Sequence, residues 1–264
     1  MSRLKNKLIN KILEFQEKIE DLENNLSLNE QIWTEPLEDL AVIEKSFEAD
    51  KLTGKTILDI GTDCVKPLYI ALKYEPKTII GINDDSDLYP IDIEQKSKLY
   101  VKTRIKFYDC NFFYKVKLKE ILCREKLTSF DFVLLSKTMH HLRSGECIAK
   151  ERDPKHCCQE DEEDCIYKFD EQKIFERLLN LGKKVIVYEC FFPGEDDDDK
   201  VRGRGGYFTI NEWKRILCFL TKNYKVKMIQ PLKCSINKEE FKNVISKLRQ
   251  VDCICFYVEM NGKK

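Results

Sequence analysis

The sequence predicts one α/β domain, a seven-stranded sheet with helices on both faces, preceded by a helical extension. From about residue 53 to residue 260, short apolar segments alternate with segments of helical periodicity, which is the pattern of strand–helix–strand units. The first apolar segments show no polar alternation, as expected for parallel strands that are buried on both faces. With 264 residues and 42% hydrophobic side chains, the chain is long enough to bury a full core.

The clearest strand–helix–strand unit spans residues 56–83. Thr56–Ile60 reads as a strand, Gly61–Val65 as a tight turn, Pro67–Tyr74 as a helix and Thr78–Asn83 as a second strand. Proline suits the first turn of a helix, where its missing N–H is no loss. Units of this kind bind ligands at the carboxyl ends of their strands, so we expect a site after these two strands.

The same alternation continues to the end of the chain. It predicts strands at 104–109, 129–136, 184–192, 225–229 and 251–259, and helices at 91–102, 114–125, 170–181, 210–223 and 238–248. Thr209 and Glu212 have the spacing of a capping box at the start of the helix at 210–223. Asp170 is the expected N-cap of the helix at 170–181, and Gly182 its stop signal.

Residues 1–50 are predicted to form a helical extension ahead of the main domain at 51–264. Apolar side chains repeat at spacings of four and three in its first helix: Leu8, Ile12, Phe15, Ile19, Leu22 and Leu26. This coiled-coil-like seam either packs on the body of the domain, which we favour because three heptads are few, or mediates self-association. A second helix is expected from Thr34 to about Asp50.

Charge and cysteine content narrow the class of protein. The 46 basic and 46 acidic residues cancel, which argues against a strong global field for nucleic acid but leaves a local basic patch open. No signal peptide or membrane-spanning apolar run is visible, so we expect a cytoplasmic protein whose 12 cysteines are mostly reduced. Four cysteines within apolar runs read as small buried hydrophobes: Cys190, Cys218, Cys253 and Cys255.

The segment at 56–83 resembles motifs I and II of the class I S-adenosylmethionine (SAM)-dependent methyltransferases, which have a Rossmann-like fold. Asp59 and Gly61 match the family's Asp-x-Gly-x-Gly turn, whereas Asp63 and Val65 stand where the second and third glycines would be. The position of the family's ribose-binding acid holds Asn83, followed directly by Asp84. The resemblance covers roughly residues 53–260 and rests on the order of the elements as much as on these motifs.

The resemblance implies that the protein binds SAM at the strand ends. Asp109, which follows the third strand, matches the position that accepts from the adenine amino group, and the amide of Cys110 would meet a ring nitrogen. A strand-end aspartate is also an ordinary turn or capping residue, so both readings of Asp109 stand. The full set of expected cofactor-binding residues is Asp59, Gly61, Asp63, Asn83, Asp84, Asp109, Cys110 and Ser136. Asp131 opens the fourth strand at the far edge, where a structural role is expected.

The catalytic candidates are His140 and His141, in the loop at 136–142 that follows the fourth strand. A histidine near its normal pKa would take a proton from the acceptor. The alternative is that the pair caps the next helix and packs beneath the cofactor. Methyl transfer needs a base only when the reacting atom holds a proton, since alignment of acceptor and methyl does most of the work.

An insertion at 143–169 combines thiols, a histidine and acids. Cys147, His156, one of Cys157 or Cys158, and Cys165 would make a zinc site. Their spacing fits no standard Cys-x-x-Cys pair. We therefore favour a solvated acidic loop without a metal site and keep zinc as the weaker alternative.

The segment at 193–208 follows the fifth strand and contains an acidic run and then Arg202 and Arg204. The two arginines would hold an anionic acceptor such as a phosphate or carboxylate. The plainer interpretation is a flexible charged loop.

Two function classes therefore remain. One is a SAM-dependent methyltransferase whose acceptor (RNA, protein or small molecule) is not readable; the other is a non-catalytic methyltransferase-like binding or scaffold subunit, which the altered glycine turn motivates. A dinucleotide oxidoreductase is disfavoured because Gly-x-Gly-x-x-Gly is absent.

Overall fold

A computed structural model describes most of the α/β domain. The described residues are 43–47, 52–62, 65–83, 94, 97–98, 101–110, 112, 115–139, 171–190, 208–231, 233–236, 238–251 and 253–260. Residues 43–47 are helical, within the second helix expected of the extension. The coiled-coil-like segment at 1–29 lies outside the described residues, so its self-association stays a prediction.

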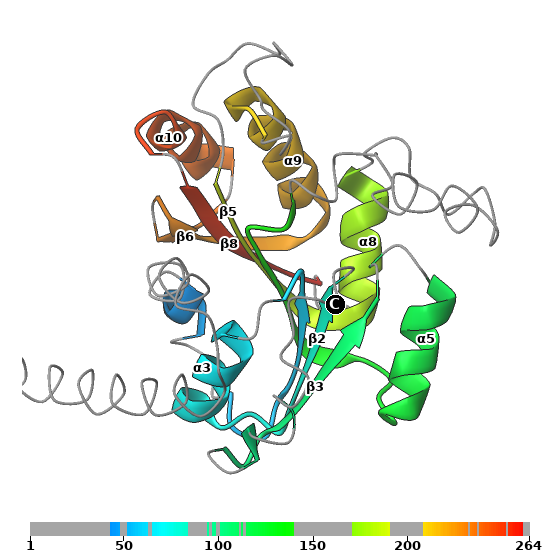
Figure 1. Cartoon of the computed structure of the whole chain (residues 1–264). Helices are drawn as coiled ribbons and strands as arrows, with labels where there is room; N and C mark the ends of the chain where they lie inside the picture. The colour runs from blue at the N-terminus through cyan, green and yellow to red at the C-terminus, as the bar shows by residue number, and fades with distance from the viewer. Residues whose placement is uncertain are drawn as a thin grey trace, which may run out of the picture.

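The described strands form one eight-stranded sheet in the order β3-β2-β1-β4-β5-β8-β6-β7 (Figure 1). The strands are β1 (Thr56–Ile60), β2 (Thr78–Asn83), β3 (Arg104–Asp109), β4 (Phe130–Ser136), β5 (Gly182–Cys190), β6 (Lys225–Gln230), β7 (Cys234–Ser235) and β8 (Cys253–Glu259). The first five pair in parallel. β8 runs antiparallel to both β5 and β6, which confirms the expected antiparallel ending of the sheet.

Besides shifts of one or two residues at the ends of β4, β6 and β8, the sheet differs from the prediction at two places. It has an eighth strand, the two-residue β7, which pairs with the outer edge of β6. β5 begins at Gly182, directly after the preceding helix, so the glycine expected to end the helix also opens the strand.

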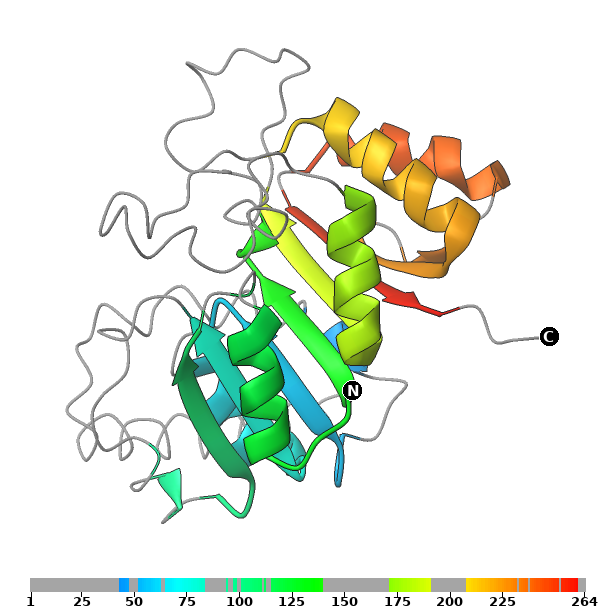
Figure 2. The same cartoon turned by 90° about the vertical axis from the view of Figure 1, so that its right-hand side faces the viewer.

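Helices cover both faces of the sheet and create two apolar cores. The described helices are α3 (Val65–Tyr74), α5 (Lys115–Arg124), α8 (Glu171–Leu181), α9 (Ile210–Asn223) and α10 (Lys238–Leu248). Residues 43–47 and α3 pack on one face. The other four helices pack on the opposite face, and Figure 2 shows α5, α8 and α9 lying across it. No helix in the described part of the chain is long and apolar enough to cross a membrane.

α9 shows how the sequence fixes an element. Thr209 is its N-cap, and its side chain accepts a hydrogen bond from the amide of Glu212 while the Glu212 carboxylate accepts from the Thr209 amide. The predicted capping box is thus confirmed. On the buried side of the helix, the Trp213 ring contacts Phe208 and Phe256 at centroid distances of 5.0 and 5.9 Å, geometry that favours aromatic pairs.

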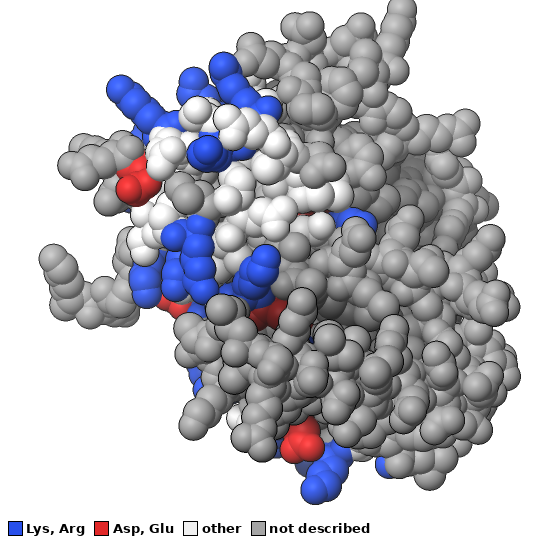
Figure 3. Space-filling model, turned by 90° about the vertical axis from the view of Figure 1, so that its left-hand side faces the viewer, with Lys and Arg blue, Asp and Glu red and all other residues white. Residues whose placement is uncertain are grey.

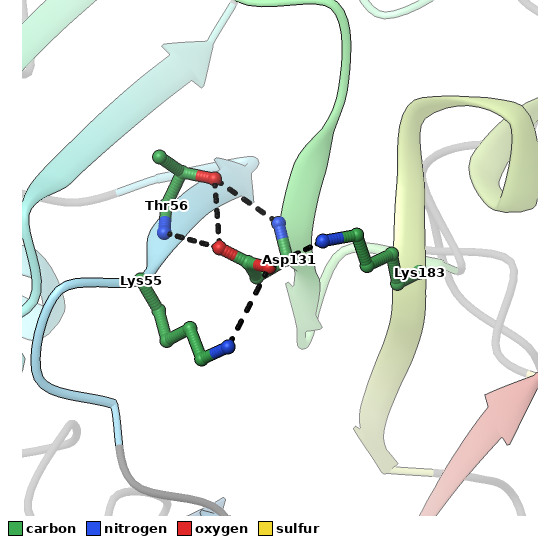
Figure 4. Close-up of polar contacts among 4 residues, drawn as sticks. All are labelled: Lys55, Thr56, Asp131 and Lys183. Carbon is green, nitrogen blue, oxygen red and sulfur yellow. Dashed lines mark hydrogen bonds and ion pairs between the residues drawn. The ribbon is translucent and has the colours of Figure 1, made fainter.

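Asp131 ties together three strands at the amino end of the sheet (Figure 4). Its carboxylate accepts from the Thr56 amide at 3.0 Å and from the Lys183 ammonium at 2.8 Å, and Lys55 lies 3.8 Å away. Burial acts to raise the pKa of Asp131, but the hydrogen bonds from Lys183 and Thr56 and the nearby lysine charges outweigh it, so the pKa lies below its usual value. These contacts agree with the structural role expected of this residue.

Candidate functional site

The candidate site lies where the order of the sheet reverses. From β1 the chain adds β2 and β3 on one side, and then returns to add β4 and β5 on the other. β1 and β4 are direct neighbours, with Ile60 opposite Leu135 near their carboxyl ends. In open α/β sheets, ligands bind in the crevice outside the strand ends at such a switch point.

The turn after β1 is held tightly against β2 and the loop after β4. Gly61 has a left-handed backbone, with φ of +67°. Its amide and that of Thr62 both donate to the Ile82 carbonyl, at 2.9 and 3.2 Å. A Cβ atom at Gly61 would come within 2.3 Å of the Thr138 side chain, so both the backbone angle and the packing require glycine. Asp63, the next expected contact in this turn, lies outside the described residues.

Asn83 ends β2 and links it to the same turn. Its side-chain amide donates to the Thr62 carbonyl at 2.9 Å, so the side chain points from β2 toward the turn that follows β1. Asp84, the alternative ribose contact, lies outside the described residues. The structure therefore brings Asn83 next to the Gly61–Thr62 turn, as the resemblance implies.

Asp109 and Cys110 lie at the end of the next strand. Asp109 is opposite Asn83 in the β2–β3 register and is exposed, with the Lys117 ammonium 4.0 Å from its carboxylate. The Cys110 amide donates to the Asn83 carbonyl at 2.7 Å, so the N–H expected to meet an adenine nitrogen is already engaged within the protein. Burial raises the pKa of the Cys110 thiol to about 11, which keeps it neutral at pH 7.

The loop after β4 begins with a left-handed turn at Lys137, whose φ is +51°. Its amide donates to the Tyr188 carbonyl at 2.8 Å, and the Ser136 carbonyl accepts from the Thr138 hydroxyl at 2.9 Å. Ser136 is itself buried. His140 and His141 follow Met139 directly but lie outside the described residues, so their catalytic role stays a prediction.

Three buried charged side chains lie near these strand ends: Asp59, Lys66 and Glu189. Asp59 was expected from the resemblance, whereas the other two were not singled out. Lys66 is in the first turn of α3, and Glu189 is near the end of β5, where its carboxylate accepts from the Cys190 amide at 3.0 Å. Each is a charged residue within an apolar run. That position was the only feature of the sequence from which Lys66 and Glu189 could have been predicted.

No cluster of His, Cys, Asp or Glu suited to a metal ion occurs among the described residues. The insertion at 143–169, with its candidate zinc ligands, lies outside them. The zinc prediction therefore stays untested.

Solved structures match this arrangement over most of the chain. No protein-family model and no curated protein matches the sequence. The methyltransferase domain of the bacterial protein CtHen1-C matches at 14% identity, with 84% of this chain and 97% of that chain covered and a TM-score of 0.51. This is the fold of the class I SAM-dependent methyltransferases. The YcgJ protein of Bacillus subtilis matches at 12% identity, with 85% and 99% covered and a TM-score of 0.49. The plantazolicin methyltransferase BpumL, solved with SAH, matches at 15% identity, with 90% and 91% covered and a TM-score of 0.48.

The methyltransferase fold accounts for where the expected residues lie. Asp59, Gly61, Asn83, Asp109, Cys110 and Ser136 all come from the carboxyl ends of four neighbouring parallel strands. Hydrogen bonds join the Gly61–Thr62 turn to β2, and β2 to the residue after β3. The methyltransferase site predicted from sequence is thus one continuous edge of the sheet, and the binding roles of its residues remain predictions.

Proposed function

We propose that the protein transfers a methyl group from SAM to an acceptor atom on another molecule. The observation that carries this proposal is the meeting of Asn83, Asp109 and the Gly61–Thr62 turn at the switch point of a methyltransferase fold. SAM, when bound, supplies a methyl group that is already activated by the sulfonium. The protein then has to bind, orient and exclude water, which are tasks that hydrogen-bonding groups on rigid strand ends can perform.

The side chains at this edge suit a nucleoside. The Asp109 carboxylate would accept from the adenine amino group, since 58% of its side chain is exposed. The Asn83 amide donates to Thr62, so the side-chain oxygen is the atom that would accept from a ribose hydroxyl. The Gly61–Thr62 backbone would lie beside the ribose.

Acceptor chemistry would come from the loops that follow β4 and β5. His140 or His141 would remove a proton from an acceptor that carries one, in which case turnover would fall at low pH as the imidazole becomes protonated. Arg202 and Arg204 would hold a phosphate or carboxylate of the acceptor. Replacing both arginines by alanine would then weaken acceptor binding and leave SAM binding unchanged.

Calorimetric titration with SAM tests the proposal. We expect saturable binding, weakened by about ten- to a hundredfold in Asp109→Ala, since a lost hydrogen bond to a charged group costs about 1.5–3 kcal/mol. Glu120→Ala is the matched control, because Glu120 is an exposed acid in the middle of α5, and it should leave affinity unchanged. An unmodified protein that does not bind SAM saturably would overturn the proposal.

One observation favours a second candidate, a methyltransferase-like scaffold subunit. Asp63 and Val65 occupy positions where the family has glycines, and side chains there hinder a close approach of the backbone to a ligand. A labelled-SAM assay against RNA, protein and metabolite pools separates the two. Binding of SAM without transfer to any pool, or no binding, would favour the scaffold.

A further inference from the structure

The C-terminal part of the domain is strongly basic although the whole chain is neutral. Residues 208–251 contain ten Lys or Arg and three acids, whereas the complete chain has 46 of each. The remainder of the chain therefore carries a compensating negative charge. Such an asymmetry within one chain indicates a local electrostatic surface.

Two of the three acids of this segment have described side chains, and neither is exposed. Glu212 is buried in the capping box with Thr209. Glu240 is half-buried and accepts from the Asn243 side chain at 3.3 Å. Among the described side chains of α9 and α10, the exposed charged residues are all positive.

These charges lie on the outer sides of two adjacent helices. α9 and α10 contact each other and bury their apolar sides in the same core, so their polar sides face outward together. We call their exposed Lys and Arg the basic α9–α10 surface: Lys214, Arg215, Lys222, Lys242, Lys247 and Arg249 of the turn after α10.

The spacing of the charges produces rows. Arg215 and Lys222 are seven residues apart on α9, which places them on one side of the helix about 10 Å from each other. Lys242 and Arg249 repeat that spacing at α10. Figure 3 looks onto the side of the molecule where α10 lies in Figure 1, and blue side chains gather in its upper part with little red among them.

We propose that the basic α9–α10 surface binds the phosphate backbone of a nucleic acid. Rows of cations separated by about two helical turns can contact successive phosphates, and this attraction supplies most sequence-independent affinity for nucleic acid. α10 leads into β8, whose first residue Cys253 is opposite Cys190 at the end of β5, so α10 ends toward the edge of the sheet that holds the candidate site.

Two other anionic partners fit the surface less well. A membrane-surface helix needs an exposed apolar side, and the apolar sides of α9 and α10 are buried in the core. A protein interface is anchored by apolar or aromatic side chains. Among the described residues, the exposed large hydrophobic side chains are Val116 and Met260, and neither belongs to these helices.

Fluorescence anisotropy with labelled single-stranded RNA and DNA of about 20 nucleotides, without SAM, tests the proposal on the full chain. Contacts to about four phosphates predict a slope of about −3 for log affinity against log salt, so binding should weaken roughly 60-fold between about 50 and 200 mM salt. Equal affinity for RNA and DNA would indicate contacts to the phosphate backbone alone. A higher affinity for RNA would indicate additional contacts to the sugar. Either result supports the proposal.

Charge reversal locates the surface. The triple variant Lys214→Glu, Lys222→Glu and Lys242→Glu should bind at least about tenfold more weakly, and the corresponding Lys→Gln variant should show a smaller loss in the same direction. The control for the triple Lys→Glu variant carries the same substitution at Lys77, Lys102 and Lys126, which are exposed in the loops before β2, β3 and β4. Circular dichroism melting checks that each variant folds.

The proposal fails if the oligonucleotides do not bind, if binding is insensitive to salt, or if the control variant loses as much affinity as the test variant. It also fails if poly-glutamate or anionic lipid vesicles compete as well as unlabelled oligonucleotide at equal charge. Because no step depends on SAM, failure here leaves the proposed methyl transfer untouched, and failure of SAM binding leaves this surface untouched.

Discussion

Asp131 should contribute measurably to stability, and removing its carboxylate is the sharpest test of how the strands are joined. It accepts hydrogen bonds from the amide and hydroxyl of Thr56, at 3.0 and 3.3 Å, and pairs with Lys183 at 2.8 Å (Figure 4). The side chain is 17% exposed, whereas that of Lys183 is 73% exposed. The contacts to Thr56 should therefore carry more stability than the ion pair.

The size of the effect follows from those exposures. Asp131→Ala leaves the amide and hydroxyl of Thr56 without their acceptor, which costs about 1.5–3 kcal/mol for bonds to a charged group. The ion pairs with the exposed lysines add at most about 1 kcal/mol. A total loss of about 2–3 kcal/mol lowers the melting temperature by about 5–10 °C for a chain of this size. Asp131→Asn keeps an acceptor oxygen of the same shape and should lose only about 1 kcal/mol.

Urea denaturation as a function of pH separates the charge from the shape. The pKa of Asp131 is lowered in the folded state, so its charge-dependent stabilisation is present above the unfolded pKa of about 3.9 and is lost as the pH falls through the folded value. The difference between the unmodified protein and Asp131→Asn should be constant from about pH 7 to 5 and shrink below about pH 4. Glu120→Gln, at an exposed position, is the control. A loss below about 0.5 kcal/mol for Asp131→Ala, or a charge contribution that persists at about pH 2, would refute the reasoning.

Two further predictions concern the second half of the domain. Thr209→Ala should destabilise the protein by about 1 kcal/mol, because it removes an N-cap whose hydroxyl accepts from Glu212; urea denaturation measures this, and Thr209→Ser, which keeps the hydroxyl, should behave almost as the parent. Cys190 and Cys253 face each other with 3.3 Å between their sulfur atoms, so the oxidant diamide, which takes up the two thiol hydrogens, should join them and reduce the protein's mass by two hydrogens. Their shared hydrogen bond, and then burial, raise the pKa of Cys190, so alkylation should be slow at pH 7 and faster at higher pH. A Cys253→Ser variant that still loses two hydrogens under diamide would contradict the assignment of the pair.

Much of the fold could be predicted because its central strands are apolar runs bounded by turn residues. The observed bounds of β1, β2, β3 and α10 coincide with the predicted ones. The prediction began β5 too late, at Lys184, because Gly182 was expected to end the preceding helix. Lys184 is buried within the strand instead, 3.0 Å from the Glu259 carboxylate and 4.2 Å from the centre of the Tyr257 ring. β7 is two residues long, too short for any periodicity to appear.

The sequence predicted which strand ends form the candidate site, but not which hydrogen bonds connect them. Strand order alone brings Asn83 and Asp109 to one edge. The bond from the Cys110 amide to the Asn83 carbonyl depends on the register between β2 and β3, which no local pattern encodes. The pairing of Cys190 with Cys253 depends likewise on the register of two strands whose cysteines are 63 residues apart. Of the four cysteines expected to be buried, only Cys255 is fully so; Cys190, Cys218 and Cys253 are half-buried.

Gly61 is the residue that most resembles the methyltransferase motif, yet packing alone accounts for it. Its backbone is left-handed, and a Cβ atom there would lie 2.3 Å from the Thr138 side chain, so glycine would be required even without a cofactor. Gly61→Val would therefore disturb the fold and the site together, and a loss of SAM binding in that variant would not identify a contact. Asp109 is exposed at the strand end, so its substitution should change affinity without opening the core. For this reason, substitution of Asp109 tests the function of the site more directly than substitution of Gly61, the glycine that resembles the family motif.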